Sequence, residues 1–142
     1  MLVRPFRLSD YSAIASLFHD VLSEACCEET MAAFARQLAL DPDLVLVADV
    51  DKELTGVIFG TIDQRNRGYY YRVAVAESYQ RKGIGKSLIA GLKQKFTQRK
   101  VSKILVTVDA HNEPVIPVYK AVGYTDIDFS RSFHHLRIVS NR

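Results

Sequence analysis

The chain has 142 residues, of which 48% are hydrophobic and 25% charged, and its formal net charge is +3. A chain of this length is predicted to form one domain over residues 1–142. Its mild charge, without a long basic run, excludes the pattern of a nucleic-acid-binding protein. No apolar run reaches transmembrane length and the N-terminus lacks a signal-peptide pattern, so we expect no nucleic-acid and no membrane partner.

The first half of the chain carries strand and helix patterns in turn. Leu2–Phe6 is predicted as a short strand, and Leu44–Val50 and Leu54–Ile62 as two strands joined by a polar turn. Asp63–Gly68 reads as a polar loop. Two apolar stripes at helical spacing lie between the first and second strands: Ile14, Leu17, Phe18, Val21 and Leu22, then Met31, Phe34, Ala35 and Leu38.

The second half predicts a strand, a helix and a returning strand. Tyr69–Ala76 and Lys103–Asp109 are the strands, and such a crossover normally makes a parallel pair. A further helix is expected between Asn112 and Val122, and Pro117 should kink this helix or shift its start. The tail, Tyr124–Phe129 and Phe133–Val139, is predicted to be a terminal hairpin. The apolar stripe of the crossover helix is Ile84, Leu88, Ile89, Leu92 and Phe96.

The two cysteines, Cys26 and Cys27, are adjacent in a predicted helix. A disulfide between them would be strained, so a reduced, cytoplasmic protein is the simplest expectation. His134 and His135 are adjacent on a predicted strand, face opposite ways and lack metal-ligand spacing. We therefore predict no metal site.

The most informative segment is Gln80–Ser87, which joins a strand to a helix. Gly83 and Gly85 remove side chains where the loop enters the helix, so backbone N–H groups can approach a ligand closely. The first N–H groups of a helix have no internal partner and favour an anion. Three basic residues add positive charge there: Arg81, Lys82 and Lys86. The segment predicts a phosphate-bearing ligand, although a plain glycine turn at a helix start is the structural alternative.

Spacing separates this segment from two common phosphate motifs. A Walker A loop needs a glycine where the chain has Gln80. A dinucleotide fingerprint needs a third glycine where the chain has Leu88. The pattern that remains is Gln-x-x-Gly-x-Gly after a strand.

A second motif follows the next strand, and the two together resemble the GNAT superfamily of acyl-CoA N-acyltransferases. The loop matches Gln/Arg-x-x-Gly-x-Gly/Ala at Gln80, Gly83 and Gly85. The later block resembles Asn-x-x-Ala-x-x-Leu-Tyr-x-x-x-Gly-Phe, with valines for Ala and Leu and a tyrosine for Phe. Its matching positions are Asn112, Val115, Val118, Tyr119, Gly123 and Tyr124. Val3-Arg4-Pro5 and Asp10 also look like the start of the family, so the resemblance covers nearly the whole chain.

The resemblance implies the fold and the general reaction. The fold would be a single α/β (α+β) domain with a mixed, mostly antiparallel sheet of about seven strands and about four helices. A splayed parallel strand pair would form the acyl-CoA cleft. The reaction would be direct attack of a primary amine, on a small molecule or a peptide or protein, on the thioester of acetyl-CoA.

Cofactor contacts follow from the same resemblance. Main-chain groups of Val73, Ala74 and Val75 would line the pantetheine arm and hold the thioester carbonyl, where a backbone donor can stabilise an oxyanion. Asn112 would contact the pantetheine or cap the helix. The pyrophosphate would be held at the Gln80 motif by N–H groups of Arg81, Lys82, Gly83, Ile84, Gly85, Lys86 and Ser87.

Tyr119 matches the family tyrosine that protonates the departing thiolate, which a neutral hydroxyl can do. The alternative is a buried helical aromatic. Some family members carry a glutamate base early in the strand before the loop, but here that position falls in Tyr69-Tyr70-Tyr71. The substitutes are Asp63, Asp109 and His111. Asp109, directly or through water, is our working assignment. The structural alternatives are a strand-end cap for Asp109 and a surface loop residue for His111.

A non-catalytic acyl-CoA-binding sensor or interaction module is the second hypothesis. The missing carboxylate favours it and the retained Tyr119 disfavours it. Acceptor specificity is expected to come from Cys26–Leu40, Asp63–Gly68 and the C-terminal hairpin, which carry no family motif. A homodimer is compatible with such folds, but no residue establishes one.

Overall fold

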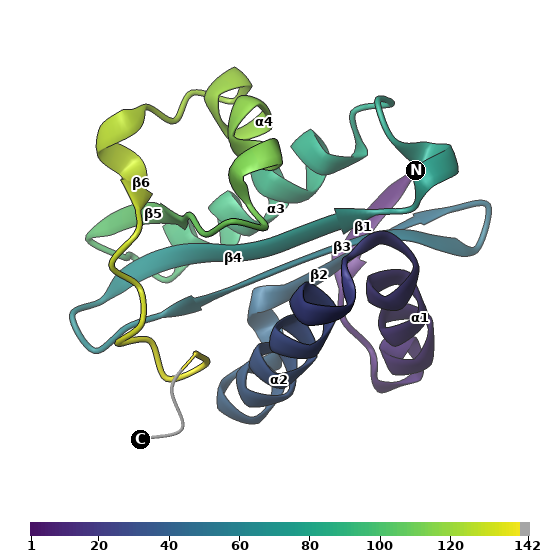
Figure 1. Ribbon diagram of the computed structural model, residues 1–142, viewed down its shortest axis with the longest axis horizontal. Coiled ribbons are helices and arrows are strands. Elements are labelled where there is room, and N and C mark those ends of the chain that lie inside the picture. Colours follow the sequence, from purple (N-terminus) through teal and green to yellow (C-terminus); the bar gives the residue numbers. More distant parts are fainter. Residues whose placement is uncertain (140–142) are drawn as a thin grey trace.

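The structure is a computed structural model that describes residues 1–139. One sheet runs through the molecule, with helices on both faces (Figure 1). The strands are β1 (Leu2–Pro5), β2 (Val45–Val50), β3 (Glu53–Ile62), β4 (Arg67–Val75), β5 (Lys103–Thr107) and β6 (Phe129–Ser130). The α-helices are α1 (Tyr11–Val21), α2 (Glu24–Leu40), α3 (Ile84–Gln98) and α4 (Ile116–Ala121). Within the described residues, no helix is both long and apolar enough to cross a membrane.

The sheet follows the order of the chain from β1 to β6. Neighbours from β1 to β4 are antiparallel, whereas β4, β5 and β6 run parallel. One apolar core packs α1 and α2 against one face, and a second core packs α3 and α4 against the other. Figure 1 shows these two layers on opposite sides of the sheet. The predicted mixed, mostly antiparallel fold is confirmed, with six strands in residues 1–139 instead of about seven.

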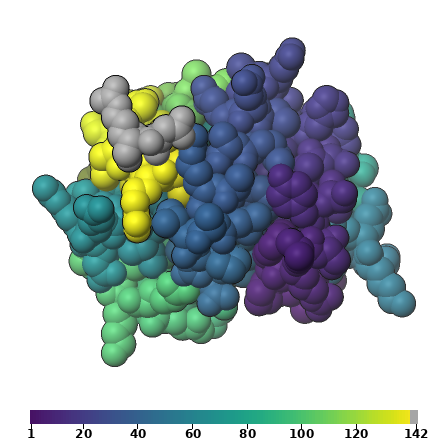
Figure 2. Space-filling model, turned by 90° about the horizontal axis from the view of Figure 1, so that it is seen from below, coloured from purple at the N-terminus to yellow at the C-terminus, as the bar shows by residue number. Residues whose placement is uncertain are grey.

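The predicted terminal hairpin is wrong. β6 has only two residues and pairs parallel to β5, with Phe129 opposite Val106. Residues 133–139 form consecutive turns, in which Leu136 N–H donates to Phe133 O and Val139 N–H donates to Leu136 O. Apolar residues spaced by three suit such turns and not the period of two that a strand requires. The tail instead lies against α2 (Figure 2), where Arg36 donates to Ile138 O at 2.9 Å.

The parallel pair β4 and β5 separates along its length. Residues Arg67 to Tyr70 of β4 pair with Lys103 to Val106 of β5, but β4 continues to Val75 while β5 ends at Thr107. No β5 residue is in register with Val73, Ala74 or Val75. The outer half of β4 therefore has an edge that faces away from β3 and lacks a strand partner.

A bulge in β4 sets which side chains reach α2. Phe59 of β3 pairs with Arg72, and the next β3 residue pairs with Tyr70, so Tyr71 has no partner on β3. Such an extra residue shifts the alternation of side chains along a strand. Tyr71 packs in the core beneath α1 and α2, and Arg72 on the same side bonds to Thr30 of α2.

The helix that contains Tyr119 begins four residues after Asn112, the first residue of the second motif. A short 3₁₀ turn covers Glu113–Val115, and α4 begins at Ile116, with Pro117 in its first turn. Pro117 has no N–H to donate, and the first turn is where that loss is tolerated. The predicted shift of the helix start is confirmed, and it leaves Asn112 outside α4.

Candidate active site

The glycine loop delivers a row of unpartnered amides to the open edge of β4. The N-cap of α3 is Gly83, which has no side chain to cap the helix. The first helical bond is donated by Ser87 N–H to Gly83 O at 3.0 Å. The N–H groups of Ile84, Gly85 and Lys86 therefore have no partner inside α3 and, with the helix dipole, favour an anion.

The two glycines are required for different reasons. Gly83 has φ +83°, a left-handed conformation that strains any other residue. Gly85 is already helical, and a Cβ there would meet only Val75 Cγ2, at 4.0 Å. No neighbour among the described residues excludes a side chain at position 85. The absence of a side chain there is instead what close approach of a phosphate would require.

The basic residues of the loop are exposed around this helix start. Arg81 has φ +64°, and the Lys82 ammonium lies 5.3 Å from the centre of the Tyr79 ring. The Gln80 side chain folds back onto β4, where its Nε2 donates to Val75 O at 3.0 Å. This bond links the loop to the end of the strand. The loop is thus a positively charged turn anchored to the strand.

A cleft of about 580 Å³, which we call the α3 cleft, lies between this loop, the open edge of β4 and the turn before α4. It is lined by nine of the residues expected to contact the cofactor: Val73, Ala74, Val75, Gln80, Arg81, Gly83, Ile84, Gly85 and Lys86. The remaining expected residues, Lys82, Ser87, Asn112 and Tyr119, do not form its wall. His111, a candidate base, and Val115 and Val118 of the second motif also line it, and sequence reasoning missed the lining residues Val21, Leu22, Tyr79 and Pro114.

Asn112 lies beneath the cleft and closes the base of the strand separation. Its Nδ2 donates to Tyr71 O at 3.1 Å and to Thr107 O at 3.0 Å. These carbonyls belong to β4 and β5, just beyond their last paired residues. The amide side chain therefore takes the place of ladder hydrogen bonds where the strands part.

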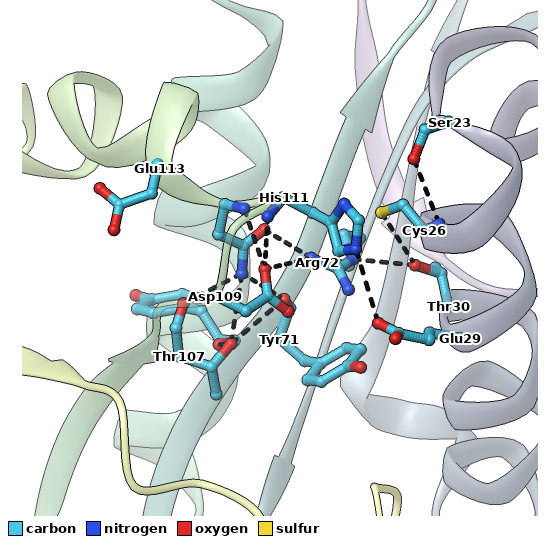
Figure 3. A network of polar contacts seen from close by, with 12 residues as sticks. Ser23, Cys26, Glu29, Thr30, Tyr71, Arg72, Thr107, Asp109, His111 and Glu113 are labelled. Atoms are coloured by element: carbon cyan, nitrogen blue, oxygen red, sulfur yellow. Dashed lines mark hydrogen bonds and ion pairs between the residues drawn. The ribbon is translucent and has the colours of Figure 1, made fainter.

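Arg72 is a buried cation that sequence reasoning missed. Its side chain is 2% exposed and lies between α2 and the loop after β5 (Figure 3). Nη1 donates to Asn112 Oδ1 at 2.7 Å, and Nε donates to Thr30 Oγ1 at 2.9 Å. Asp109 Oδ1 lies 3.5 Å from Nη1 and supplies the nearest carboxylate. A charged residue inside an otherwise apolar strand was the available signal.

Asp109 and His111 follow the end of β5. Asp109 Oδ1 accepts hydrogen bonds from the backbone N–H groups of His111 and Asn112, at 2.9 and 3.0 Å. The imidazole of His111 extends toward α2, with its Nε2 3.7 Å from Glu29 Oε2 (Figure 3). Asp63 lies elsewhere, at the β3–β4 turn, where it bonds to Arg67 and Tyr69.

Tyr119 is 3% exposed and packs against Tyr70 and Tyr124, with ring centres 5.3 and 6.3 Å away. Its hydroxyl makes no hydrogen bond within the described part of the chain, whereas Tyr70 and Tyr124 bond to each other at 2.6 Å. Burial raises the pKa of Tyr119 well above its usual value, and the positive charge of Arg72 opposes this rise. The hydroxyl therefore holds its proton at neutral pH.

A second hollow of about 740 Å³, the α2 hollow, lies on the other side of His111. α2, the loop after β5 and the C-terminal tail form its walls. Glu28, Glu29 and Asp109 contribute carboxylates, while Tyr71 and Phe133 contribute aromatic surface. Over residues 1–139, no group of three or more His, Cys, Asp or Glu side chains is placed to hold a metal ion.

Comparison with known proteins agrees with this arrangement. The profile of the Acetyltransferase (GNAT) family matches residues 11–124. An acetyltransferase of Pectobacterium atrosepticum is 32% identical over 128 residues, which cover 90% of each chain. One of Photorhabdus laumondii is 34% identical, over 89% of this chain and 87% of the relative.

Solved structures show the same fold at lower identity. A GNAT family acetyltransferase of Brucella melitensis, in complex with acetyl-CoA, is 19% identical with a TM-score of 0.72. That alignment covers 89% of this chain and 83% of the other. The PaiA N-acetyltransferase of Thermoplasma acidophilum, in complex with coenzyme A, is 19% identical with a TM-score of 0.70, over 87% and 89% of the two chains. On the family profile and the curated relatives, this chain belongs to the GNAT family of acetyltransferases.

Proposed function

We propose that this protein is an N-acetyltransferase that moves an acetyl group from acetyl-CoA to a primary amine of a small molecule or a peptide. Acetyl-CoA is the acyl donor, in keeping with the family. One observation carries the proposal. The N-terminus of α3, with its free amides, and the unpaired edge of β4 both border the α3 cleft. The free thiols of Cys26 and Cys27 agree with a reduced, cytoplasmic location.

The α3 cleft has groups that suit both the pyrophosphate and the pantetheine arm of acetyl-CoA. Amides of Ile84, Gly85 and Lys86, together with the basic loop, would hold the pyrophosphate, and position 85 is free of a side chain that would block it. Val73 to Val75 would hold the pantetheine arm through their main chain, because no β5 residue is in register with them. When bound, acetyl-CoA supplies a thioester whose carbonyl carbon can be attacked by an amine.

Tyr119 is proposed to give a proton to the sulfur. Its hydroxyl stays protonated because burial raises its pKa. Burial also makes proton release costly, and Arg72 is the cation that offsets this cost by lowering the same pKa. Asn112 would act beneath the site, by keeping β4 and β5 apart at a fixed width.

The acceptor is proposed to enter through the α2 hollow. The carboxylates of Glu28, Glu29 and Asp109 outnumber the guanidinium of Arg36 on the wall of this hollow, whereas the loop at the α3 cleft is basic. Carboxylates attract a protonated amine and repel an acidic acceptor. Two titratable side chains at the inner end of the hollow, Asp109 and His111, could take the amine proton.

The test has two stages. Calorimetry with acetyl-CoA should show binding at micromolar to submillimolar concentration, and no binding at millimolar concentration would reject the proposal. Thiol release is then followed with 1,4-diaminobutane, tyramine, Nα-acetyl-lysine amide and alanyl-alanine amide. Release that depends on an amine supports the enzyme. Binding without such release from any amine would favour the acyl-CoA-binding module instead.

A further inference from the structure

His111 lies at the junction of the two hollows. Among the described residues, it is the one that lines both the α3 cleft and the α2 hollow. The acetyl group is proposed to reach this junction from one side and the acceptor amine from the other. His111 is therefore a titratable side chain that borders both the proposed donor site and the proposed acceptor site.

The imidazole lies beside a carboxylate from a distant part of the chain. Glu29 belongs to α2, and its Oε2 lies 3.7 Å from Nε2 of His111. Figure 3 shows the other ring nitrogen, Nδ1, directed away from Glu29. No hydrogen bond to Nδ1 occurs within residues 1–139, so this nitrogen is available to accept a proton.

Asp109 is already committed to structural contacts. Its Oδ1 accepts two backbone N–H groups and is the carboxylate oxygen nearest to buried Arg72. Protonation of Asp109 would weaken all three contacts and leave Arg72 without a counter-charge. Protonation of His111 breaks no hydrogen bond and places a positive charge beside Glu29.

We propose that His111 is the general base of acetyl transfer and that Glu29 is its positioning residue. This inference rests on the proposed function. His111 Nδ1 takes a proton from the protonated acceptor amine, and the neutral nitrogen then forms a bond to the acetyl carbonyl carbon and releases its second proton to solvent. The carbon–sulfur bond breaks, and the sulfur takes the Tyr119 proton. His111 then gives its proton to solvent and Tyr119 regains one, so the products are the N-acetyl amide and the free thiol of coenzyme A.

The charges around His111 favour this role. Glu28 and Glu29 face it from α2, Asp109 lies in its own loop, and His134 lies in the tail across the α2 hollow. Arg72 of β4 is the buried cation nearby, and Asp109 and Asn112 contact it first. Arg36 of α2 also lines this hollow and donates to Ile138 O, so three carboxylates and one guanidinium stand on the wall beside the imidazole.

The first test compares the unaltered protein with His111→Gln, using two acceptors of different basicity. General bases contribute about 10²- to 10⁴-fold, so kcat/KM for Nα-acetyl-lysine amide should fall at least about 100-fold. The loss should be smaller for alanyl-alanine amide, because an α-amine near pKa 7.8 is already neutral about one time in seven at pH 7. Acetyl-CoA affinity, measured by calorimetry, should not change. His19→Gln on the exposed face of α1 is the matched control, with unchanged rates.

The second test separates Glu29 from its neighbour. Glu29→Gln should lower kcat by about two- to fivefold, the factor an exposed ion pair can supply, with little change in KM for the amine. Glu28→Gln removes the same charge from the same hollow but not the carboxylate beside His111. It should raise KM for the amine and leave kcat unchanged. Glu29→Asp should recover part of kcat.

The outcomes reject different claims. If the unaltered protein transfers acetyl groups and His111→Gln does so at a rate within about twofold, His111 is not the base, and the proposed function still stands. An unchanged kcat in Glu29→Gln would overturn the role of Glu29. Acetyl-CoA binding without transfer to any tested amine would reject the proposed function and the base assignment together.

Discussion

Arg72 Nη1 donates a 2.7 Å hydrogen bond to Asn112 Oδ1, and this bond links β4 to the loop that follows β5. The amide nitrogen of the same Asn112 side chain bonds to carbonyls of both strands. The buried Asn112 side chain therefore bonds to the carbonyls of Tyr71 and Thr107, at the point where the two strands part. The same side chain accepts a hydrogen bond from the Arg72 guanidinium. We therefore expect the width of the α3 cleft to depend on this contact.

Replacing Asn112 by alanine is expected to destabilise the fold by about 2–4 kcal/mol, because buried carbonyls and the Arg72 cation lose partners. Urea unfolding measures the loss. Thr97→Ala, which removes an exposed bond to Lys93 O, serves as the control and should change stability little. Equal effects of the two substitutions would contradict the role given to Asn112.

Gly85→Ala and Gly83→Ala should separate binding from folding. At position 85 a methyl group meets no close neighbour and improves helix propensity, so stability should be kept while acetyl-CoA affinity falls at least tenfold, or about 1.4 kcal/mol. At position 83 the positive φ should make alanine destabilising by roughly 1 kcal/mol. Thermal unfolding and calorimetry measure the two effects. Unchanged affinity in Gly85→Ala would argue against pyrophosphate at this helix start.

Tyr119→Phe should lower the rate of transfer about 10²-fold or more without loss of stability or acetyl-CoA affinity, because the hydroxyl makes no hydrogen bond in the described structure. Since burial raises the Tyr119 pKa, the Tyr119 hydroxyl should keep its proton up to pH 10. The rate of transfer should therefore not fall between pH 7 and pH 10 through deprotonation of Tyr119. Tyr124→Phe, which loses the bond to Tyr70, is the matched control. Stopped-flow thiol release should show a rate defect only in the Tyr119 variant.

Asp63 should make folding stability depend on acid pH. Burial would raise its pKa, but hydrogen bonds from Arg67, Tyr69 and Arg65 lower it to about 2, against 3.8 in the absence of these contacts. Because the folded-state pKa is the lower one, the carboxylate stabilises the fold above pH 4, and this contribution is lost as the pH falls toward 2. The shift corresponds to about 2 kcal/mol.

Asp63→Asn should therefore remove that stability at pH 7 and flatten the decline between pH 4 and pH 2. Asp126→Asn, at an exposed carboxylate paired with Lys120, should leave the pH dependence unaltered. Chemical unfolding at a series of pH values gives the comparison. A decline that persists unchanged in Asp63→Asn would show that other carboxylates cause it.

The sequence predicted the parts of the site that depend on local chemistry. The glycines and basic residues of Gln80–Ser87 are adjacent in the chain, and their positions at a strand-to-helix turn follow from spacing alone. The family resemblance predicted the parallel pair β4 and β5 and its separation, whereas the strand order came from the structure. Proline chemistry likewise predicted the late start of α4.

The parts that sequence could not supply depend on contacts between distant segments. The bulge at Tyr71 shifts the alternation in β4, so period-two reasoning could not place Arg72 against α2. The contact between Glu29 and His111 joins α2 to a loop after β5, and neither residue carries a motif. The strand predicted for the tail is wrong because Phe133 and Leu136 have the three-residue spacing of turns.

The central claim is that this chain forms an amide between an acetyl group and an amine. The most direct measurement incubates the unaltered protein with acetyl-CoA carrying a ¹³C-labelled acetyl group and the four amines named above, and identifies the products by mass spectrometry and NMR. We predict a labelled acetyl group on the amine nitrogen of at least one acceptor, formed together with free thiol and absent in Tyr119→Phe on the same timescale. Tight binding of acetyl-CoA with no labelled amide from any acceptor would contradict the account.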